Sequence, residues 1–491
     1  MDMFHNFDGR LKILNNDVAV HITRSNVGVI RHKGDNLRLS DDFTVKASID
    51  EATLLNLKTR EKFDLDKEQV DFIRSCDGTQ TETEIISQYD EKSVLVVEEL
   101  IVNLHRIGAI EYNSDPREVE INRVPTPRLQ VVHFEPFSKC NMFCIHCYQG
   151  DRYDREKDNL TLDEIKGLVK QMKTMQVEGV SISGGEPFVD LMILDAAVYI
   201  EECEMKVLSF FTNGILITKE VVKRVKALRG KPTFFVSVDS ATGYGMNFRS
   251  MNQLQGDEAV KKIVKAMETL VKNGFDVVVN TVLNVCNIQD LEKMHEMMRK
   301  LKVRSWRIGY PKRTGNFANK DYQGFEVPSE KLLERCLEVL QYHFEKGKPF
   351  DLQIEYLYRR SLVENFHEVA DDDYVCDYEN RREGCCIKPN GDVVSCAYCC
   401  DQVLGNIKQQ PLWDIWYSDK MRAIKDLRIK DIEECKDCEL RNYCATGCRA
   451  NACFLGGEFG KSKDLYACKA VKFFKERVVP FVEGLYEQNP R

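Results

Sequence analysis

Residues 131–148 read Val-Val-His-Phe-Glu-Pro-Phe-Ser-Lys-Cys-Asn-Met-Phe-Cys-Ile-His-Cys-Tyr, a short apolar run followed by three closely spaced cysteines. The apolar run predicts a β-strand, and Cys140, Cys144 and Cys147 fall in the loop after it. Three thiolates can hold three irons of a [4Fe–4S] cube and leave the fourth iron open for another ligand. The alternative is a structural zinc knuckle, which fits less well because zinc requires a closed set of four ligands and His146 lies within the tight turn.

Strand-like and helix-like patterns alternate from this loop onward. The apolar runs predict strands at 131–135, 179–183, 207–212, 233–239, 277–283 and 304–308, and amphipathic runs predict helices at 161–176, 190–203, 218–229, 257–273 and 288–301. Regular alternation of this kind predicts an α/β fold with a parallel sheet and right-handed crossovers. Six β/α units are fewer than the eight of a closed barrel, so we predict a partial (β/α)6 barrel whose functional groups lie at the carboxyl ends of its strands.

Glycines and polar residues stand at three of these strand ends. The second strand ends in Ser183-Gly184-Gly185-Glu186-Pro187, the third in Thr212-Asn213-Gly214 and the fourth in Ser237-Val238-Asp239-Ser240. Adjacent glycines let a ligand approach the backbone, and the Glu186 carboxylate can accept a hydrogen bond from an ammonium group. Each motif alone is also explained by a simple turn or a helix cap, but their order on successive strands favours one binding site.

The C-x3-C-x2-C spacing with Tyr148 after it, combined with these strand-end motifs, resembles radical S-adenosylmethionine (SAM) enzymes over about residues 131–310. The resemblance implies that Cys140, Cys144 and Cys147 hold a [4Fe–4S] cluster whose open iron binds SAM. It also implies SAM contacts from Gly184, Gly185, Glu186, Asn213, Ser237, Asp239 and Arg249, of which Arg249 has the fork geometry to bind the SAM carboxylate. In such enzymes one electron cleaves SAM to methionine and a 5′-deoxyadenosyl radical, which removes a hydrogen atom from the substrate.

The chain is unusually rich in cysteine, with 19 in 491 residues, and 12 of them lie between Cys376 and Cys468. The amino terminus lacks the order of a secretory signal, and no apolar run approaches the roughly 20 residues of a membrane span. We therefore expect a cytoplasmic protein that does not contact a membrane. In a reducing compartment, clustered cysteines indicate metal or iron–sulfur ligation in preference to disulfides.

The carboxyl-terminal cysteines have a defined spacing. Cys376 is followed after 14 residues by Gly391 and after four more by Cys396, and Cys435-x2-Cys438-x5-Cys444-x3-Cys448 and Cys468 complete the set. This pattern resembles the seven-cysteine SPASM domains, which bind two auxiliary [4Fe–4S] clusters. The resemblance implies one cluster on Cys435, Cys438, Cys444 and Cys468, and three ligands of the other from Cys376, Cys396 and Cys448. A pair of zinc ribbons is the alternative.

The fourth ligand of the second auxiliary cluster is left open by the sequence. Cys385 and Cys386 are the nearby candidates, and if neither binds, the open iron could take a substrate thiolate. Ala397 stands where sulfatase-maturing relatives carry an aspartate base, which disfavours that activity. Three cysteines of this region, Cys399, Cys400 and Cys453, have no assigned role, and Cys76, Cys203, Cys286 and Cys336 are expected to be core thiols.

Residues 1–115 predict a separate α+β unit. Strands at 27–30 and 37–39 could form a hairpin, helices are expected at 67–76, 81–88 and 94–107, and a strand at 108–112 closes the unit. The pattern resembles PqqD-like domains, winged-helix-like units that bind the leader of a ribosomally made precursor peptide by β-augmentation. A DNA-binding winged helix is disfavoured because this segment holds 14 Lys and Arg against 22 Asp and Glu, which repels phosphate. A structural lid is the third alternative.

The resulting domain organisation is a peptide-recognition domain at 1–115, a linker at 116–130, a radical SAM partial barrel at 131–325, a bridging region at 326–370 and a SPASM domain with a terminal helix at 371–491. This combination predicts an oxidoreductase that cross-links a precursor peptide, with a thioether between a cysteine sulfur and a carbon as the first choice. Carbon–carbon cross-linking and epimerisation are the alternatives, and an iron–sulfur DNA-binding regulator is a more distant one. The expected partners are the precursor peptide and a reductant such as flavodoxin or ferredoxin, with no nucleic acid.

Overall fold

The computed structural model describes residues 12–13, 35–150, 152–154, 156–246, 248–249, 256–358, 370–376, 383–399 and 401–488. Two compact units make up the chain. The first comprises residues up to 130 together with the short segments 172–178 and 200–206, and the second comprises the remainder. The strand expected at 27–30 lies outside the described residues.

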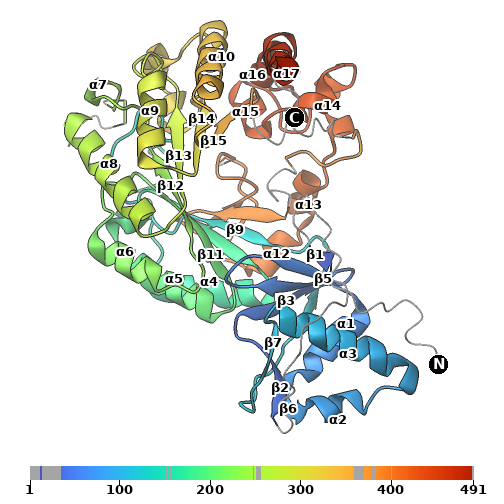
Figure 1. Ribbon diagram of the computed structural model, residues 1–491. Helices are drawn as coiled ribbons and strands as arrows, with labels where there is room; N and C mark the ends of the chain where they lie inside the picture. Colours follow the sequence, from blue (N-terminus) through green and yellow to red (C-terminus); the bar gives the residue numbers. More distant parts are fainter. Residues whose placement is uncertain are drawn as a thin grey trace. The chain divides into compact units, whose positions relative to one another are not determined.

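The first unit is an α+β structure with two sheets around one core. One sheet has the order β1 (Lys12–Ile13), β5 (Lys62–Leu65), β4 (Ala52–Asn56), β3 (Phe43–Ser48) and β8 (Arg123–Val124), and the other has the order β6 (Asp77–Thr81), β2 (Asn36–Leu39) and β7 (Ile110–Tyr112). Three helices, α1 (Lys67–Ser75), α2 (Glu82–Ile86) and α3 (Glu91–Arg106), complete it (Figure 1). Apolar side chains from both sheets and all three helices form a single core, which includes Cys76.

The helices of this unit begin where the sequence provides caps. Asp66 and Thr81 each form a capping box at the start of α1 and α2, and the Asp90 side chain accepts hydrogen bonds from two backbone amides of α3. The antiparallel strands β3, β4 and β5 were not predicted from the sequence. Every residue of β3 and β4 is buried. The run Phe43-Thr-Val-Lys-Ala-Ser48 alternates apolar and polar residues, so β3 was detectable from the sequence.

The second unit is built on a ten-stranded sheet. Its order is β15 (Asp351–Ile354), β14 (Ser305–Gly309), β13 (Val277–Val282), β12 (Thr233–Ser237), β11 (Lys206–Thr212), β10 (Gly179–Ile182), β9 (Val131–Phe134), β16 (Gly384–Ile387), β17 (Asp392–Val394) and β18 (Gly405–Asn406). β9 pairs in parallel with both β10 and β16, and β11 to β15 form parallel pairs in sequence order. β17 and β18 continue the sheet as antiparallel strands.

This sheet confirms the predicted partial barrel, and all six predicted strands are present with ends shifted by at most two residues. Two further parallel strands extend it. β15 adds to β14 from the bridging region, and β16 adds to β9 from the cysteine-rich region, with Cys386 directly opposite His133. The carboxyl-terminal region therefore contributes a strand to the barrel sheet.

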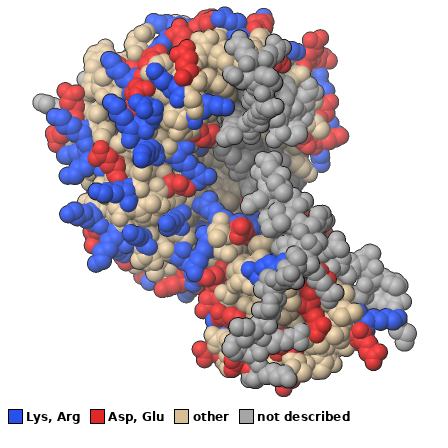
Figure 2. Space-filling view, viewed as in Figure 1, with Lys and Arg blue, Asp and Glu red and all other residues tan. Residues whose placement is uncertain are grey.

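Amphipathic helices alternate with the strands along the chain (Figure 1). They are α4 (Leu162–Thr174), α5 (Met192–Glu202), α6 (Lys219–Lys226), α8 (Gly256–Lys272), α9 (Leu291–Leu301) and α10 (Ser329–Glu345). The lysines of α6 and α8 are exposed while the apolar residues between them are buried, and Figure 2 shows Lys and Arg side chains gathered over these outer helices. This separation of charged and apolar faces is what the helical periodicity of the sequence predicts.

The carboxyl-terminal region consists of short elements followed by a longer helical tail. The tail comprises α16 (Leu465–Phe473), a π-helical turn at Phe474–Val478 and α17 (Val479–Gln488), in agreement with the expected terminal helix. None of the helices in the described part of the chain is both long and apolar enough to cross a lipid bilayer.

Candidate active site and cluster-binding cysteines

A cavity of about 560 Å³ lies at the carboxyl ends of the barrel strands. Its wall includes Cys140, Cys144 and Cys147 from the loop after β9, and Cys396 and Cys448 from the carboxyl-terminal region. Strand-end residues from β9 to β16 complete the wall. The volume is within the range of small-molecule and cofactor sites, and the position is where a parallel α/β sheet places its ligands.

The two glycines of the second strand end support the cysteine loop. The backbone amides of Gly185 and Glu186 donate hydrogen bonds to the carbonyl oxygens of Phe137 and Lys139 at 2.7 and 2.9 Å. A Cβ atom on Gly185 would overlap the Lys139 carbonyl oxygen, and Gly184 has a φ of +125° that side chains rarely adopt. Glycine is therefore required here because the cysteine loop passes directly against the strand end, and both glycines also line the cavity.

Glu186 is fully buried behind this strand end. Its carboxylate accepts hydrogen bonds from the Thr212 hydroxyl and the Asn213 backbone amide, both at 2.7 Å, and from the Phe188 amide at 3.3 Å. Burial raises the pKa of Glu186 to about 7 in spite of these donors. The Asn213 side chain lines the cavity and donates to the Asn141 side chain at 2.8 Å, so the third strand end is also tied to the cysteine loop.

Asp239, Arg249 and His146 form a buried group beside the same loop. Arg249 donates through Nε to Asp239 at 2.9 Å, and its Nη2 lies 3.1 Å from Nε2 of His146. Burial lowers the pKa of His146 to about 4, so the ring is neutral, and it stacks on Phe248 at 4.6 Å between centroids. Arg249 and Ser237 line the cavity. Of the sequence-predicted SAM contacts, Gly184, Gly185, Asn213, Ser237 and Arg249 line the cavity, whereas Glu186 and Asp239 are buried behind its wall.

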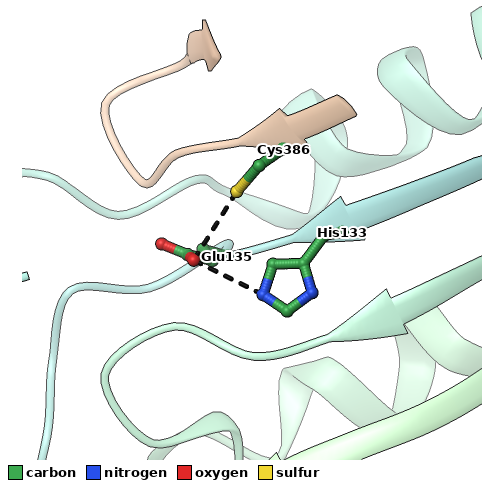
Figure 3. Close-up of side chains that lie close together, drawn as sticks. All are labelled: His133, Glu135 and Cys386. Atoms are coloured by element: carbon green, nitrogen blue, oxygen red, sulfur yellow. Dashed lines mark hydrogen bonds and ion pairs between the residues drawn. The ribbon is translucent and has the colours of Figure 1, made fainter. Parts of the chain in front are cut away.

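A second buried network surrounds Glu135, at the end of β9. Its carboxylate receives hydrogen bonds from Lys388 at 2.9 Å, Tyr148 at 2.7 Å and Gln149 at 2.6 Å. Glu135 and Lys388 are both 0% exposed. Although burial opposes ionisation, the charge of the Lys388 ammonium, together with its hydrogen bond to the carboxylate, holds the pKa of Glu135 well below its usual range. Figure 3 shows Glu135 between His133 and Cys386, each 3.5 Å from its Oε1 atom.

This network was not predicted from the sequence. Lys388 also donates to the Ala397 carbonyl at 2.8 Å, so the network connects the residues after Cys147 with the loop that follows Cys396. The sequence signal for this network was Glu135 itself, a charged residue directly after a buried apolar strand. Its cationic partner comes from a strand about 250 residues later, which no local pattern could indicate. A metal ion among His133, Glu135 and Cys386 is disfavoured because the Lys388 ammonium already pairs with the carboxylate.

The cysteines of the carboxyl-terminal region lie in two groups. Electrostatic interactions among Cys435, Cys438, Cys444 and Cys468 place these four thiols together. Cys448 interacts instead with Cys376 and Cys396. The grouping is the one that the SPASM spacing implies.

The cysteines that had no firm assignment are placed as follows. Cys386 is buried against Glu135, and Cys385 interacts with the Lys425 side chain. Cys399 is buried and hydrogen-bonds the Cys396 thiol. Cys400 lies outside the described residues. Cys76, Cys203 and Cys336 are buried as expected of core thiols, whereas Cys286 is half-buried.

The residues fit an iron–sulfur cluster that binds SAM. Three thiols line one cavity, and the cation of Arg249 lies 3.9 Å from the Cys144 sulfur. Nδ1 of His146 is buried and has no hydrogen-bond partner in the part of the chain that the structure describes. Because Nε2 faces the Arg249 donor, Nδ1 carries the proton and is available to a group bound at the cysteines.

Comparison with known proteins identifies two domains. Residues 134–301 match the model of the radical SAM superfamily, and residues 376–439 match the SPASM model, described as an iron–sulfur cluster-binding domain. The AdoMet-dependent heme synthase of Methanosarcina barkeri is 27% identical over 353 residues, which are 68% of this chain and 94% of that protein. The mycofactocin maturase MftC of Mycolicibacterium smegmatis is 30% identical over 157 residues, 31% of this chain and 38% of MftC.

The fold also resembles that of a solved structure. The crystal structure of SuiB from Streptococcus suis bound to the precursor peptide SuiA has a TM-score of 0.63 at 17% identity and covers 88% of this chain and 99% of the SuiB chain. Residues 131–491 are only about three quarters of the sequence, so the similarity includes part of the first unit. The chain therefore contains a radical SAM domain followed by a SPASM domain, and these imply a SAM-binding [4Fe–4S] cluster together with auxiliary clusters.

Proposed function

We propose that the protein is a maturase that oxidatively cross-links a ribosomally made precursor peptide, forming a thioether between a cysteine sulfur and a carbon. The observation that carries this proposal is the cavity shared by the two cysteine regions. Cys140, Cys144 and Cys147 face the same space as Cys396 and Cys448. A substrate in this space would lie between the SAM site and an auxiliary cluster, which suits an oxidation that ends in electron transfer.

In this proposal Cys140, Cys144 and Cys147 hold the SAM-binding cluster. Arg249 and the strand ends at Gly184, Gly185, Glu186, Asn213, Ser237 and Asp239 orient SAM. When bound, these groups supply a 5′-deoxyadenosyl radical that removes a substrate hydrogen atom, and the auxiliary clusters supply an acceptor for the remaining electron. The chain's own contribution is to fix the cysteine loop against Gly185 and to surround the substrate with a wall that limits access of water. A flavodoxin or ferredoxin would deliver the initiating electron.

We assign the ligands of the two auxiliary clusters according to the two groups of carboxyl-terminal cysteines described above. Cys435, Cys438, Cys444 and Cys468 would hold one cluster, and Cys376, Cys396 and Cys448 would supply three ligands of the other. A sulfatase-maturing activity remains disfavoured because Ala397 has no side-chain base and its carbonyl oxygen accepts from Lys388.

The first unit would bind the leader of the precursor, as a PqqD-like domain does. Its three-stranded sheet supports this role, because β6 and β7 are the outer strands of the order β6-β2-β7 within the described residues. An extended peptide can add to such an outer strand through main-chain hydrogen bonds. The fold similarity to SuiB, whose crystal contained a precursor peptide, and the sequence similarity to the maturase MftC also favour a peptide substrate.

A tetrapyrrole substrate is the second candidate. It is favoured by the AdoMet-dependent heme synthase, because the alignment covers 94% of that protein. The same alignment covers 68% of this chain and leaves about a third of it unaccounted for. The additional length favours a substrate that needs a separate recognition unit.

The proposed reaction is tested by incubating the anaerobically reduced enzyme with SAM and the short peptide encoded next to its gene. We expect a product lighter by two hydrogen atoms, as determined by mass spectrometry. Thiol alkylation before fragmentation separates a thioether, which consumes a cysteine thiol, from a carbon–carbon bond. An unchanged peptide mass with continued SAM cleavage contradicts cross-linking. Formation of heme from a porphyrin precursor in a parallel reaction would instead support the second candidate.

Leader recognition is tested by amide hydrogen exchange on the full-length protein with and without the leader peptide. We expect slower exchange at β6 or β7, because an added strand shields outer-strand amides. Protection confined to residues after 131 would assign leader binding to the second unit and contradict the proposed role of the first.

A further inference from the structure

The auxiliary group of Cys376, Cys396 and Cys448 supplies three thiols, whereas a fully ligated [4Fe–4S] cluster needs four ligands. The identity of the fourth ligand decides what this cluster can do. A fourth protein ligand restricts the cluster to electron transfer, and an open iron can bind a substrate thiolate. Cys385, Cys386 and Cys399 are the described cysteines near this group that could supply the fourth ligand.

Cys386 interacts with Cys396, but its thiol is also in contact with a buried carboxylate. It lies on β16 opposite His133, and its thiol is 3.5 Å from Glu135 Oε1 (Figure 3). Ligation by Cys386 would bring a thiolate next to the buried Glu135 carboxylate, and the two negative charges would repel each other. Cys385 precedes it on the same strand, so its side chain points to the opposite face, where it interacts with Lys425, the ammonium that also interacts with Cys376 and Cys396.

Cys399 is in direct contact with the auxiliary group. Its backbone amide donates to the Cys396 carbonyl at 2.9 Å, which closes a tight turn around residues 396–399. The Cys399 thiol hydrogen-bonds the Cys396 thiol and interacts with Cys448. Two cysteines separated by two residues on a tight turn are a spacing with which proteins bind metals and iron–sulfur clusters.

The charge around this group is suited to four thiolates. Lys425 is 7% exposed, and its ammonium interacts electrostatically with Cys376, Cys385, Cys396 and Cys399. It is held in place by hydrogen bonds to the carbonyl oxygens of Gly384 at 2.5 Å and Ser395 at 3.4 Å. Lys312 also lies near Cys448, but its ammonium is paired with Glu355 at 2.7 Å. The buried Lys425 ammonium therefore offsets part of the negative charge that four thiolates bring into a buried site.

From this arrangement we propose that Cys399 is the fourth ligand of the auxiliary cluster held by Cys376, Cys396 and Cys448. This assignment rests on the proposed function, because it presupposes that the chain binds the auxiliary clusters. It specifies that this cluster is fully ligated by the protein and accepts an electron without binding the substrate sulfur. The peptide cysteine would then form its bond to carbon without first coordinating iron.

The test uses the full-length chain carrying Cys140→Ala, Cys144→Ala and Cys147→Ala, so that only the auxiliary clusters remain. Anaerobic reconstitution should give about eight irons per chain, four per cluster. Adding Cys399→Ala should expose one iron, which mild oxidation removes. We expect about seven irons per chain and the EPR signal of a [3Fe–4S] cluster. Cys385→Ala and Cys386→Ala are the matched controls and should retain about eight irons without that signal.

Several outcomes would overturn the proposal. One is the [3Fe–4S] signal in the parent protein before Cys399 is changed, and another is the signal in Cys386→Ala or Cys385→Ala but not in Cys399→Ala. If Cys399→Ala loses the whole cluster, Cys399→Ser decides. A ligating serinate should retain about eight irons and shift the reduction potential of one cluster, and an unshifted potential contradicts ligation. Absence of auxiliary iron from the parent protein would instead contradict the proposed function.

Discussion

At the scale of single residues, the Glu135–Lys388 pair gives the clearest energetic expectation. Changing Lys388 to Met leaves the Glu135 carboxylate buried without its cation, which should lower the free energy of unfolding by about 3–5 kcal/mol. Anaerobic denaturant titration measures this change. Lys262→Met is the matched control, because its 2.8 Å ion pair with Glu258 is exposed and should contribute less than about 1 kcal/mol.

The double variant Glu135→Gln/Lys388→Met should regain part of the lost stability, since it removes the uncompensated charge as well. Equal effects of Lys388→Met and Lys262→Met would show that the buried pair is not the stabilising interaction inferred from its geometry. Double-mutant analysis of the two positions provides the coupling energy directly.

Glu186 gives a pH dependence at the same scale. With its pKa raised to about 7 by burial, this carboxyl is protonated below that pH and ionised above it. Since an ionised carboxylate favours the cationic SAM, affinity should weaken as pH falls below about 7, by up to tenfold per pH unit. Isothermal titration calorimetry of SAM binding to the reconstituted protein, from about one pH unit below this pKa to about one unit above it, measures the effect. Glu186→Gln should abolish this dependence, and an unchanged pH profile in that variant would assign it to another group.

The residue scale also shows what sequence reasoning could predict. The cysteine groups followed from the resemblance to SPASM domains, because spacing alone would place Cys448 with Cys444 and not with Cys376 and Cys396. The partner of Glu135 did not, because Lys388 reaches it through the pairing of β16 with β9, about 250 residues apart. The choice between Cys385 and Cys386 as the fourth auxiliary ligand likewise depended on the directions of their side chains, and Cys399 was not among the candidates.

At the scale of elements, the contact between the end of β10 and the cysteine loop predicts a strict need for glycine. In Gly185→Ala the new Cβ would overlap the Lys139 carbonyl oxygen and lie 2.5 Å from that of Ser138, so the loop must move. We expect the first cluster to be lost, with iron content reduced by about four per chain and SAM cleavage abolished. Iron analysis and assay of 5′-deoxyadenosine measure these effects.

Gly167→Ala is the control for this substitution. Gly167 lies in α4, where nothing stands within 4 Å of an added Cβ, so alanine should leave the iron content unchanged and stabilise the helix by up to about 1 kcal/mol. Full cluster occupancy in Gly185→Ala would contradict the tight approach of loop and strand.

The predictability of the elements depended on their burial pattern. The strands β9 to β14 are short apolar runs separated by amphipathic helices, and this alternation identified each of them. The strands β3 and β4 bury every residue, including Thr44 and Lys46. The alternation of Phe43-Thr-Val-Lys-Ala-Ser48 was a usable signal for β3, whereas Ala52-Thr-Leu-Leu-Asn56 of β4 shows no regular alternation. β16 was missed because Gly384-Cys-Cys-Ile387 lies among cysteines that indicate ligation.

At the scale of the whole molecule, the three thiol groups predict three separable clusters. The anaerobically prepared protein should contain about twelve irons per chain. Cys468→Ala should remove between about one and about four irons, all from one auxiliary cluster, and leave the SAM-binding cluster intact, because Cys468 interacts with Cys435 and Cys438 and not with the cavity cysteines. Iron quantification with EPR of the reduced protein tests this. A loss of about eight irons would indicate that the auxiliary clusters assemble as one unit.

The pairing of β16 with β9 has a consequence for biosynthesis. During translation, the edge of β9 next to the SAM-cluster loop stays unpaired until the ribosome has added about 250 further residues and released β16. At about 5–20 residues per second this interval lasts at least roughly ten seconds, during which an open strand edge can aggregate. Synthesis truncated before residue 384 should therefore yield insoluble barrel, and a fragment extended past residue 387 should be more soluble. Late completion of the sheet also means that the first cluster is enclosed only after most of the chain has been made.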